Sequence, residues 1–171
     1  NTHNYEKQLR SLGFHDIQQN TRAVISPLGL DIWVPHADVA IEHHDLWSHL
    51  DYCGYDRREH AKKQQMCGVL GIRLLQFFSD EWCDKRHICE SIVSHALGRS
   101  RSVGARECIV VKLDEKEAHF FFEKNHLAGH VRCSMALGLK HGEDIIAAVS
   151  FRQPFHKKHK AAGLIELARA A

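Results

Sequence analysis

One stretch, residues 28–49, places the tightest limits on what this chain can fold into. It holds two short apolar runs, 30–34 and 39–41, with Asp31 inside the first and Glu42 directly after the second. Prolines and a glycine bound the runs, which predicts two strands joined by a turn. Two neighbouring strands that each carry an acid can aim both carboxylates at one point, and such a point suits Mg²⁺, which takes carboxylate oxygens and keeps several waters. The residues alone also allow a plain hairpin with solvated polar ends.

Length and composition limit the class of protein. The 171 residues suffice for one domain and a small second unit, and a hydrophobic content of 44% supports a buried core. No apolar run is long enough for a membrane span and no signal peptide is visible. The net charge of +2 is too small to indicate a nucleic-acid partner, so any basic surface must be local. Since the chain starts at Asn1 without a methionine, a fragment of a longer protein is an open expectation.

The cysteines and histidines indicate the cellular compartment and the kind of chemistry to expect. The six cysteines are scattered and form no CxxC pair, which is typical of reduced thiols in a cytoplasm rather than of a disulfide framework. The fifteen histidines make metal binding or proton transfer worth testing.

Hydrophobic periodicity predicts the remaining elements and a mixed α/β fold. Helices are expected over 4–13, 55–71, 85–97 and 114–126, with a helix-like end at 161–171. Strands are expected around 23–25, 72–78, 108–111, 134–139 and 145–151. This order predicts a compact α/β domain over 1–98, a basic linker over 99–106, and a small α+β unit over 107–171.

Basic residues gather on the helix expected over 55–71 and in the linker. Such a face suits phosphate contacts, which supply most non-specific affinity for nucleic acids. A solvated helix face and an ordinary basic linker are the alternatives. The candidate DNA-binding residues are Arg57, Arg58, Lys62, Lys63, Arg99 and Arg101.

Four spaced segments then point to a family. Residues 5–9, 30–32, 41–49 and 71–75 resemble, in order and in separation, the very-short-patch-repair endonucleases. They resemble still more the phage homing endonucleases that share this nuclease fold, a branch of the PD-(D/E)xK superfamily, and the resemblance covers about residues 3–98. It implies a restriction-endonuclease-like core, a mixed sheet flanked by helices, and Mg²⁺-dependent or Mn²⁺-dependent cleavage of double-stranded DNA. It also implies a phage or bacterial origin and a location in the host cytoplasm.

Carried over by position, the resemblance implies roles for single residues. Asp31 is similar to the metal-binding aspartate, and Glu6 to the helix glutamate that orients metal-bound water. His44 is similar to the histidine beside the scissile phosphate, and His49 to a second histidine that assists protonation of the leaving group. Glu42 occupies the second acidic position of the superfamily, which the homing branch keeps, so Asp31 and Glu42 are the expected metal ligands.

Departures from the family pattern bear on the chemistry. His60 stands where the repair enzymes have an aspartate, so the carboxylate that would pair with His44 is not assured. Asp45 replaces a glycine, and its charge either hinders phosphate approach or adds a metal ligand. His43 is expected to be a strand-end residue with only a secondary claim to function. Of the structural zinc ligands of the repair enzymes only Cys53 has a counterpart, so we expect no such zinc site.

The second unit permits three readings. It faintly resembles the first half of an acetyltransferase-like fold found appended to phage endonucleases, although no site for an acyl-CoA pyrophosphate is evident. A DNA-contacting appendage and a plain packing domain are the other two. For the whole chain the expected function is therefore a homing-type DNA endonuclease without a membrane association, and an oligomer is left open. A non-catalytic DNA-binding module, or an acyltransferase fragment centred on 107–171, is the alternative.

Overall fold

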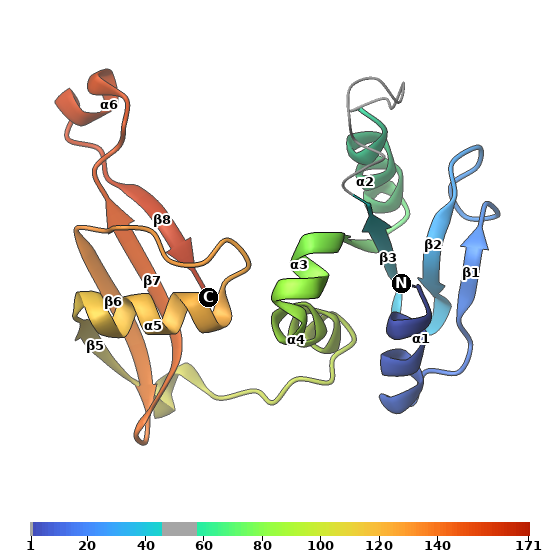
Figure 1. The fold of residues 1–171 in the computed structure, drawn as a ribbon, viewed down its shortest axis with the longest axis horizontal. Helices are drawn as coiled ribbons and strands as arrows, with labels where there is room; N and C mark the ends of the chain where they lie inside the picture. The colour runs from blue at the N-terminus through green and yellow to red at the C-terminus, as the bar shows by residue number, and fades with distance from the viewer. Residues whose placement is uncertain (1, 46–57) are drawn as a thin grey trace. The chain divides into compact units, whose positions relative to one another are not determined.

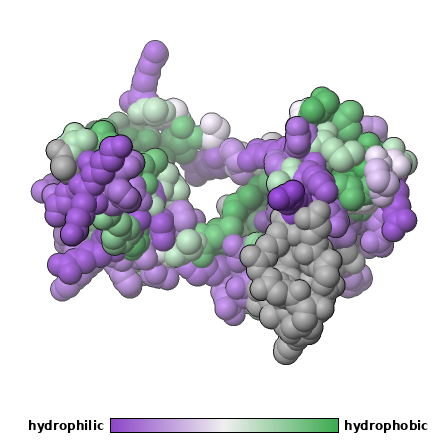
Figure 2. All heavy atoms as spheres, turned by 90° about the horizontal axis from the view of Figure 1, so that it is seen from above, coloured by the Kyte–Doolittle hydropathy of each residue, from purple (hydrophilic) through white to green (hydrophobic). Residues whose placement is uncertain are grey.

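The chain is a mixed α/β protein whose computed structural model describes residues 2–45 and 58–171 (Figure 1). The described residues form two four-stranded sheets. The chain divides into two compact units, Asn1–Ser100 and Arg101–Ala171. Hydrophilic side chains cover much of the visible surface of each unit, and hydrophobic side chains gather in patches (Figure 2). None of the helices in the described ranges has the length and apolar character that a membrane crossing needs.

The first unit is built on one mixed sheet. In chain order its elements are α1 (Thr2–Ser11), β1 (Gln18–Thr21), β2 (Leu30–Val34), a 3-10 helix (Pro35–Ala37), β3 (Val39–His44), α2 (Glu59–Val69), β4 (Arg73–Phe78), α3 (Ser79–Asp84) and α4 (Arg86–Ala96). The strands lie in the order β1-β2-β3-β4. The pairs β1–β2 and β2–β3 are antiparallel, whereas β3 and β4 are parallel and are connected through α2.

The predicted hairpin is present, and its register follows from burial on both faces. Ile32 pairs with Ile41, and Trp33 pairs with Ala40. All four side chains are buried, so a slip of one residue would exchange the side chains that fill the two faces of the sheet and disrupt the packing on each. The turn is the 3-10 helix, which ends at Asp38 in the left-handed conformation with φ 51°. The hairpin therefore fixes which side chains of β2 and β3 lie opposite each other.

Helices cover the two faces of this sheet. Cys67 of α2 packs in one core cluster with Trp33, Ala40 and Leu74. On the other face Tyr5 of α1 contacts the aromatic rings of Phe77 and Trp82. Because side chains alternate along a strand, Glu42, two residues after Ala40, is placed on the face that α2 covers.

The strand expected around 23–25 is wrong. That segment is a bent loop, and β1 lies earlier, over the polar residues Gln18–Thr21. Ile25 is still buried, at 1% exposure, because it fills the core from the loop. As an edge strand with mostly exposed side chains, β1 needs no apolar pattern, so hydrophobicity gives no sign of it.

A second, short helix immediately precedes the helix expected over 85–97. Residues Ser79–Asp84 form α3, whose start is capped when the backbone N–H of Phe78 donates to Glu81 Oε2 at 3.0 Å. Lys85, at φ −127° and ψ 37°, then interrupts the helical path before α4 begins. The acids of the first turn lie where the helix dipole favours negative charge.

The second unit is an antiparallel sheet with one long helix across it. Its elements are a 3-10 helix (Ala105–Glu107), β5 (Ile109–Leu113), α5 (Glu115–Asn125), β6 (Met135–His141), β7 (Asp144–Arg152), α6 (Lys157–Ala161) and β8 (Glu166–Ala170). The strands lie in the order β5-β6-β7-β8. In Figure 1, α5 crosses one face of this sheet, where Phe121 and Phe122 pack with Ala136 and Ala148. Asp114 caps α5 by accepting from two backbone N–H groups of its first turn.

The helix-like end expected over 161–171 is wrong for most of its length. Within that range only Ala161, the last residue of α6, is helical, and Glu166–Ala170 instead forms β8, which pairs antiparallel with β7. Arg152 of β7 holds the start of β8 through an ion pair with Glu166 at 2.6 Å. Pairing along β7 overrides the helix preference of alanine, leucine and glutamate in this segment.

Candidate active site

The two predicted metal ligands, Asp31 and Glu42, meet across the β2–β3 hairpin. The backbone N–H of Asp31 donates to Glu42 Oε1 at 3.1 Å, and the backbone N–H of His43 donates to Asp31 Oδ2 at 2.9 Å. Each carboxylate is thus held by the backbone of the opposite strand. This reciprocal arrangement fixes both side chains and leaves their negative charges close together.

Glu42 is the most deeply buried acid of this group and has a cationic partner. Its residue is 2% exposed, and Lys63 Nζ of α2 donates to its Oε2 at 2.7 Å. Burial raises the pKa of Glu42 above its ordinary value, and the charge of Asp31 raises it further, while the bond from Lys63 lowers it. The net direction is upward, so removal from water outweighs the lysine.

His44 lies on the same face as Glu42 and is buried at 7% exposure. Its Nε2 is 3.1 Å from Gln76 Oε1, and Gln76 Nε2 in turn donates to Gln64 Oε1. An amide oxygen only accepts, so in this orientation His44 Nε2 carries the proton. The His60 ring meets the His44 ring edge to face, with centroids 4.0 Å apart. His44 and His60, whose positions pair with each other in the family that the sequence resembles, are therefore in contact in the structure.

His43 points to the opposite face, where α1 packs. Tyr5 Oη lies 3.2 Å from His43 Nδ1, and Asp45 Oδ1 lies 3.7 Å from His43 Nε2. Burial raises the pKa of Tyr5 and lowers the pKa of His43, so both groups favour their neutral forms. His43, near the end of β3, thus lies between the buried phenol of Tyr5 and the exposed carboxylate of Asp45.

Glu6 has partners of its own. Its Oε1 accepts from Arg10 Nη2 at 2.7 Å, and its Oε2 accepts from Gln19 Nε2 at 2.8 Å. The bond from Arg10, followed by that from Gln19, lowers the pKa of Glu6, which keeps it ionised. Within residues 2–45 and 58–171 no hydrogen bond joins Glu6 to Asp31 or Glu42. Its predicted role in orienting water stays a prediction.

The candidate DNA-binding residues lie in different settings. Arg58 and Lys62 are exposed at the start of α2, and Arg101 is exposed in the connecting segment. Lys63 instead turns toward β3, where it pairs with Glu42. The guanidinium of Arg99 lies 5.2 Å from the centre of the Phe14 ring. Arg57, His49 and Cys53 lie outside the described residues.

The sequence did not predict the roles of two polar residues of this site, Gln76 and Lys63. Gln76 pairs directly with Glu42 in the parallel β3–β4 register and contacts His44. Lys63 was assigned to a phosphate-contacting face rather than to the carboxylates. The sequence does contain a signal for Gln76, which is a single polar residue between the apolar Leu75 and Phe77 of a strand. Lys63 gives no such sign, since a basic residue on a charged helix resembles its neighbours.

The donor set of Asp31 and Glu42 fits a hard cation. Both are oxygen ligands, and in the described part of the chain Asp31 Oδ1 accepts no hydrogen bond. Glu42 Oε2 is already neutralised by Lys63. The chain therefore offers one carboxylate oxygen of Asp31 directly, and a second from Glu42 if Lys63 shares it.

Comparison with protein families, curated proteins and solved structures gave no match.

Proposed function

We propose that the chain is a metal-dependent DNA endonuclease that hydrolyses phosphodiester bonds, with a PD-(D/E)xK core of the very-short-patch-repair-like homing class. The observation that carries the proposal is the pair of carboxylates locked across β2 and β3, with Oδ2 of Asp31 and Oε1 of Glu42 each held by the opposite backbone. A basic side chain, Lys63, reaches the same point from α2. The mixed sheet covered by helices on both faces is compatible with such a core.

In this proposal the acids would hold Mg²⁺ or Mn²⁺, which would offset the negative charge that develops on the phosphate oxygens. Asp31 is the direct ligand, because one of its oxygens accepts no bond from the described residues. Lys63 balances the charge of Glu42 and places an ammonium group beside the carboxylates, where it favours binding of an anionic phosphate. The cross-strand bonds hold both acids in place before DNA binds.

His44 supplies the proton chemistry. Its Nε2 lies 3.1 Å from Gln76 Oε1, and Gln76 in turn donates to Gln64, so this chain of contacts positions the ring. The His60 ring packs against it. A histidine held in this way can exchange a proton with the attacking water or the leaving oxygen near neutral pH. His49 and Glu6 keep the roles that the family resemblance implies.

The two bonds that occupy Glu6 and the Lys63–Glu42 pair favour a second candidate, a non-catalytic DNA-binding module. In that case Lys63 replaces the metal as the partner of Glu42, and the site is a structural ion pair. The two candidates differ in cleavage and in cation binding, but not in affinity for DNA without a cation. An acyltransferase fragment in the second unit stays a prediction that acetyl-CoA titration would test.

The deciding experiment compares Asp31→Asn with the unchanged chain, in Mg²⁺ and in EDTA. The substrate is a supercoiled plasmid that carries the DNA site at which the protein's own gene is inserted. The unchanged chain should nick or linearise the plasmid only with Mg²⁺, and Asp31→Asn should lose cleavage while it keeps DNA binding in Ca²⁺. Asp38→Asn is the matched control, because Asp38 lies on the same hairpin in a left-handed conformation that asparagine also accepts. DNA binding without Mg²⁺-dependent cleavage would select the binding module.

A further inference from the structure

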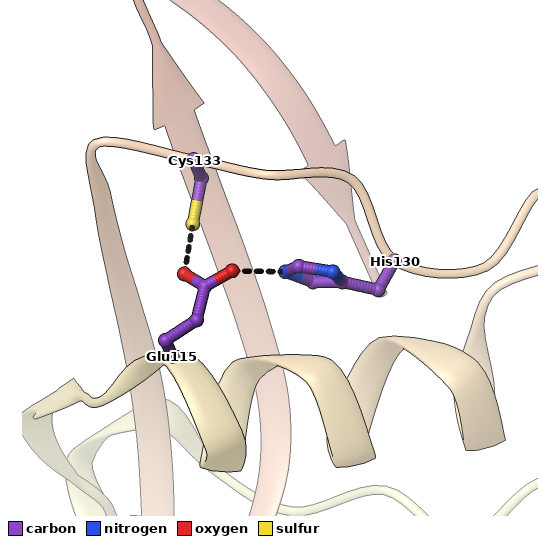
Figure 3. Close-up of side chains that lie close together, drawn as sticks. All are labelled: Glu115, His130 and Cys133. Carbon is purple, nitrogen blue, oxygen red and sulfur yellow. Dashed lines mark hydrogen bonds and ion pairs between the residues drawn. The ribbon is translucent and has the colours of Figure 1, made fainter.

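A second group of metal-binding residues lies in the second unit, on elements that share nothing with the carboxylates of β2 and β3. Glu115, His130 and Cys133 each offer a ligand atom, and the three atoms lie within 4.8 Å of one another. Figure 3 shows the carboxylate of Glu115 between the other two side chains. Its Oε1 is 3.5 Å from His130 Nε2, and its Oε2 is 4.0 Å from Cys133 Sγ.

The imidazole of His130 is buried and faces this carboxylate. Its side chain is 9% exposed, and in the described part of the chain Nε2 has no hydrogen-bond partner. The 3.5 Å contact with Glu115 is an ion-pair distance, longer than a hydrogen bond should be. A buried nitrogen left in this state costs free energy unless another group binds it. A cation between His130 and Glu115 would supply that partner.

The backbone holds the loop that carries these ligands in place. The N–H of His130 donates to Glu123 Oε1 at 2.8 Å, and Arg169 Nε of β8 donates to the carbonyl of Gly129 at 2.9 Å. Gly129 has φ +64°, and a Cβ there would lie 2.6 Å from Glu123 Oε1. The loop therefore returns over the start of α5 through a left-handed residue, a conformation that favours glycine, and this path presents His130 to Glu115.

We propose that Glu115, His130 and Cys133 bind a thiophilic divalent cation, Zn²⁺ in the first place. A tetrahedral zinc with ordinary bond lengths separates its ligand atoms by roughly 3.3–3.6 Å. The observed separations need to close by only tenths of an ångström to about one ångström. Thiolate and imidazole exclude Mg²⁺, which takes oxygen ligands. This site is separate from the zinc site of the repair enzymes, whose one counterpart here is Cys53.

The fourth position is on the open side of the cluster. Glu115 is exposed, with 59% of its side chain accessible, so water can complete the coordination. His119 follows Glu115 by four residues on α5 and therefore shares its face. Its ring centroid is 4.9 Å from that of His130. The bound cation would tie the loop between α5 and β6 to the first turn of α5, which is a structural role.

A nucleophilic cysteine is the competing explanation of the cluster, and the geometry disfavours it. Cys133 Sγ faces the carboxylate of Glu115 rather than the imidazole that would take its proton. Burial, and then the charge of Glu115, raise the pKa of the Cys133 thiol. A reactive cysteine needs the opposite shift, toward thiolate at neutral pH. Metal binding is compatible with this setting, because the cation itself displaces the thiol proton.

The test uses the full chain, stripped of metal with a chelator and titrated with Co²⁺ as a spectroscopic probe. A sulfur-to-cobalt charge-transfer band, with the visible bands of tetrahedral Co²⁺, should appear at one equivalent and vanish when Zn²⁺ is added. Cys133→Ser should remove the charge-transfer band. It should weaken Zn²⁺ binding more than about 100-fold by calorimetry, since even outer-shell losses cost 10–100-fold. Glu115→Gln, a change at an exposed position, should also weaken Zn²⁺ binding.

The matched control is Cys108→Ser, a half-buried thiol of the same unit outside the cluster, which should leave band and affinity unchanged. Asp31→Asn should leave them unchanged too, so this result is independent of the nuclease proposal. Circular dichroism without metal should be the same for every variant. Absence of the band in the unchanged chain, or a band that survives Cys133→Ser, overturns the proposal, as does unaltered Zn²⁺ affinity in Glu115→Gln.

Discussion

Lys63 Nζ lies 2.7 Å from Glu42 Oε2, and the two side chains are only 11% and 3% exposed. The attraction between the two charges stabilises this buried ion pair, and the loss of hydration of both charges opposes it. The pair also stands at the point where the two carboxylates of the hairpin converge. Lys63 is therefore expected to govern both the stability of the first unit and the charge of its candidate site.

Replacing Lys63 with methionine should destabilise the first unit by roughly 3 kcal/mol at pH 7, because Glu42 is left buried without its partner. The double variant Lys63→Met with Glu42→Gln should recover most of that loss, since neither charge remains. Urea unfolding followed by tryptophan fluorescence measures this directly, because every tryptophan of the chain falls within residues 1–100 of the sequence.

Lys62→Met is the matched control for that experiment. It removes the same charge and leaves a similar stem on the neighbouring, exposed position of α2. Surface substitutions of this kind usually change stability by no more than about 0.5 kcal/mol. Equal losses in the Lys63 and Lys62 variants would show that the buried pair contributes nothing special.

Glu42 should also give the first unit a pH dependence of definite sign. Its pKa is raised above 4.5, chiefly by burial, so the folded state binds this proton more tightly than the unfolded state. The stabilising contribution of the protonated carboxyl is full below about pH 4.5 and is lost as the pH rises through the folded pKa. The unfolding free energy of the unchanged chain minus that of Glu42→Gln should therefore fall over this window and then level off. A difference that rises with pH would contradict the assignment.

The hairpin could be predicted from sequence because its strands are buried. The strands β1 and β8 could not be predicted, because backbone pairing rather than burial creates them. Residues 30–34 and 39–44 are buried on both faces, so apolar runs and turn residues mark them clearly. The edge strand β1 has exposed polar side chains, and β8 has a helix-forming composition. Both exist because a neighbouring strand offers backbone partners. Periodicity records burial, and it does not record pairing.

The candidate site shows the same division. Asp31, Glu42 and His44 lie on two strands whose register follows from burial, so their convergence could be inferred from the chain. The partners contributed by other elements, Lys63 and Gln76, depend on how α2 and β4 pack on β3. Four basic residues in sequence give no indication of which one turns inward. The packing of Cys67 and Met66 of α2 against the sheet sets that rotation.

The exposed basic residues of α2 lead to a prediction about DNA affinity. Changing Arg58 and Lys62 together to glutamine should weaken binding to every sequence. It should also flatten the plot of log affinity against log salt by about two, since each lost phosphate contact removes about 0.9 from the slope. Lys7→Gln, on the exposed side of α1, is the control and should leave the slope as it is. An unchanged slope in the double variant would mean that this face of α2 does not contact DNA.

The last prediction concerns the contact between His44 and His60, whose ring centroids are 4.0 Å apart. A second imidazole can pack against His44 but cannot stabilise its imidazolium form by charge, as a carboxylate would. Placing a carboxylate there with His60→Asp should stabilise protonated His44. The limb of the pH–rate profile that depends on His44 should then move to higher pH. His60→Gln is the control, because it keeps a polar side chain without a negative charge, and its profile should stay in place. His44→Ala should cost far more activity than His60→Ala, since His44 is the residue proposed to exchange the proton and His60 packs against it. A profile that stays in place for His60→Asp would show that the two rings touch without coupling their charges.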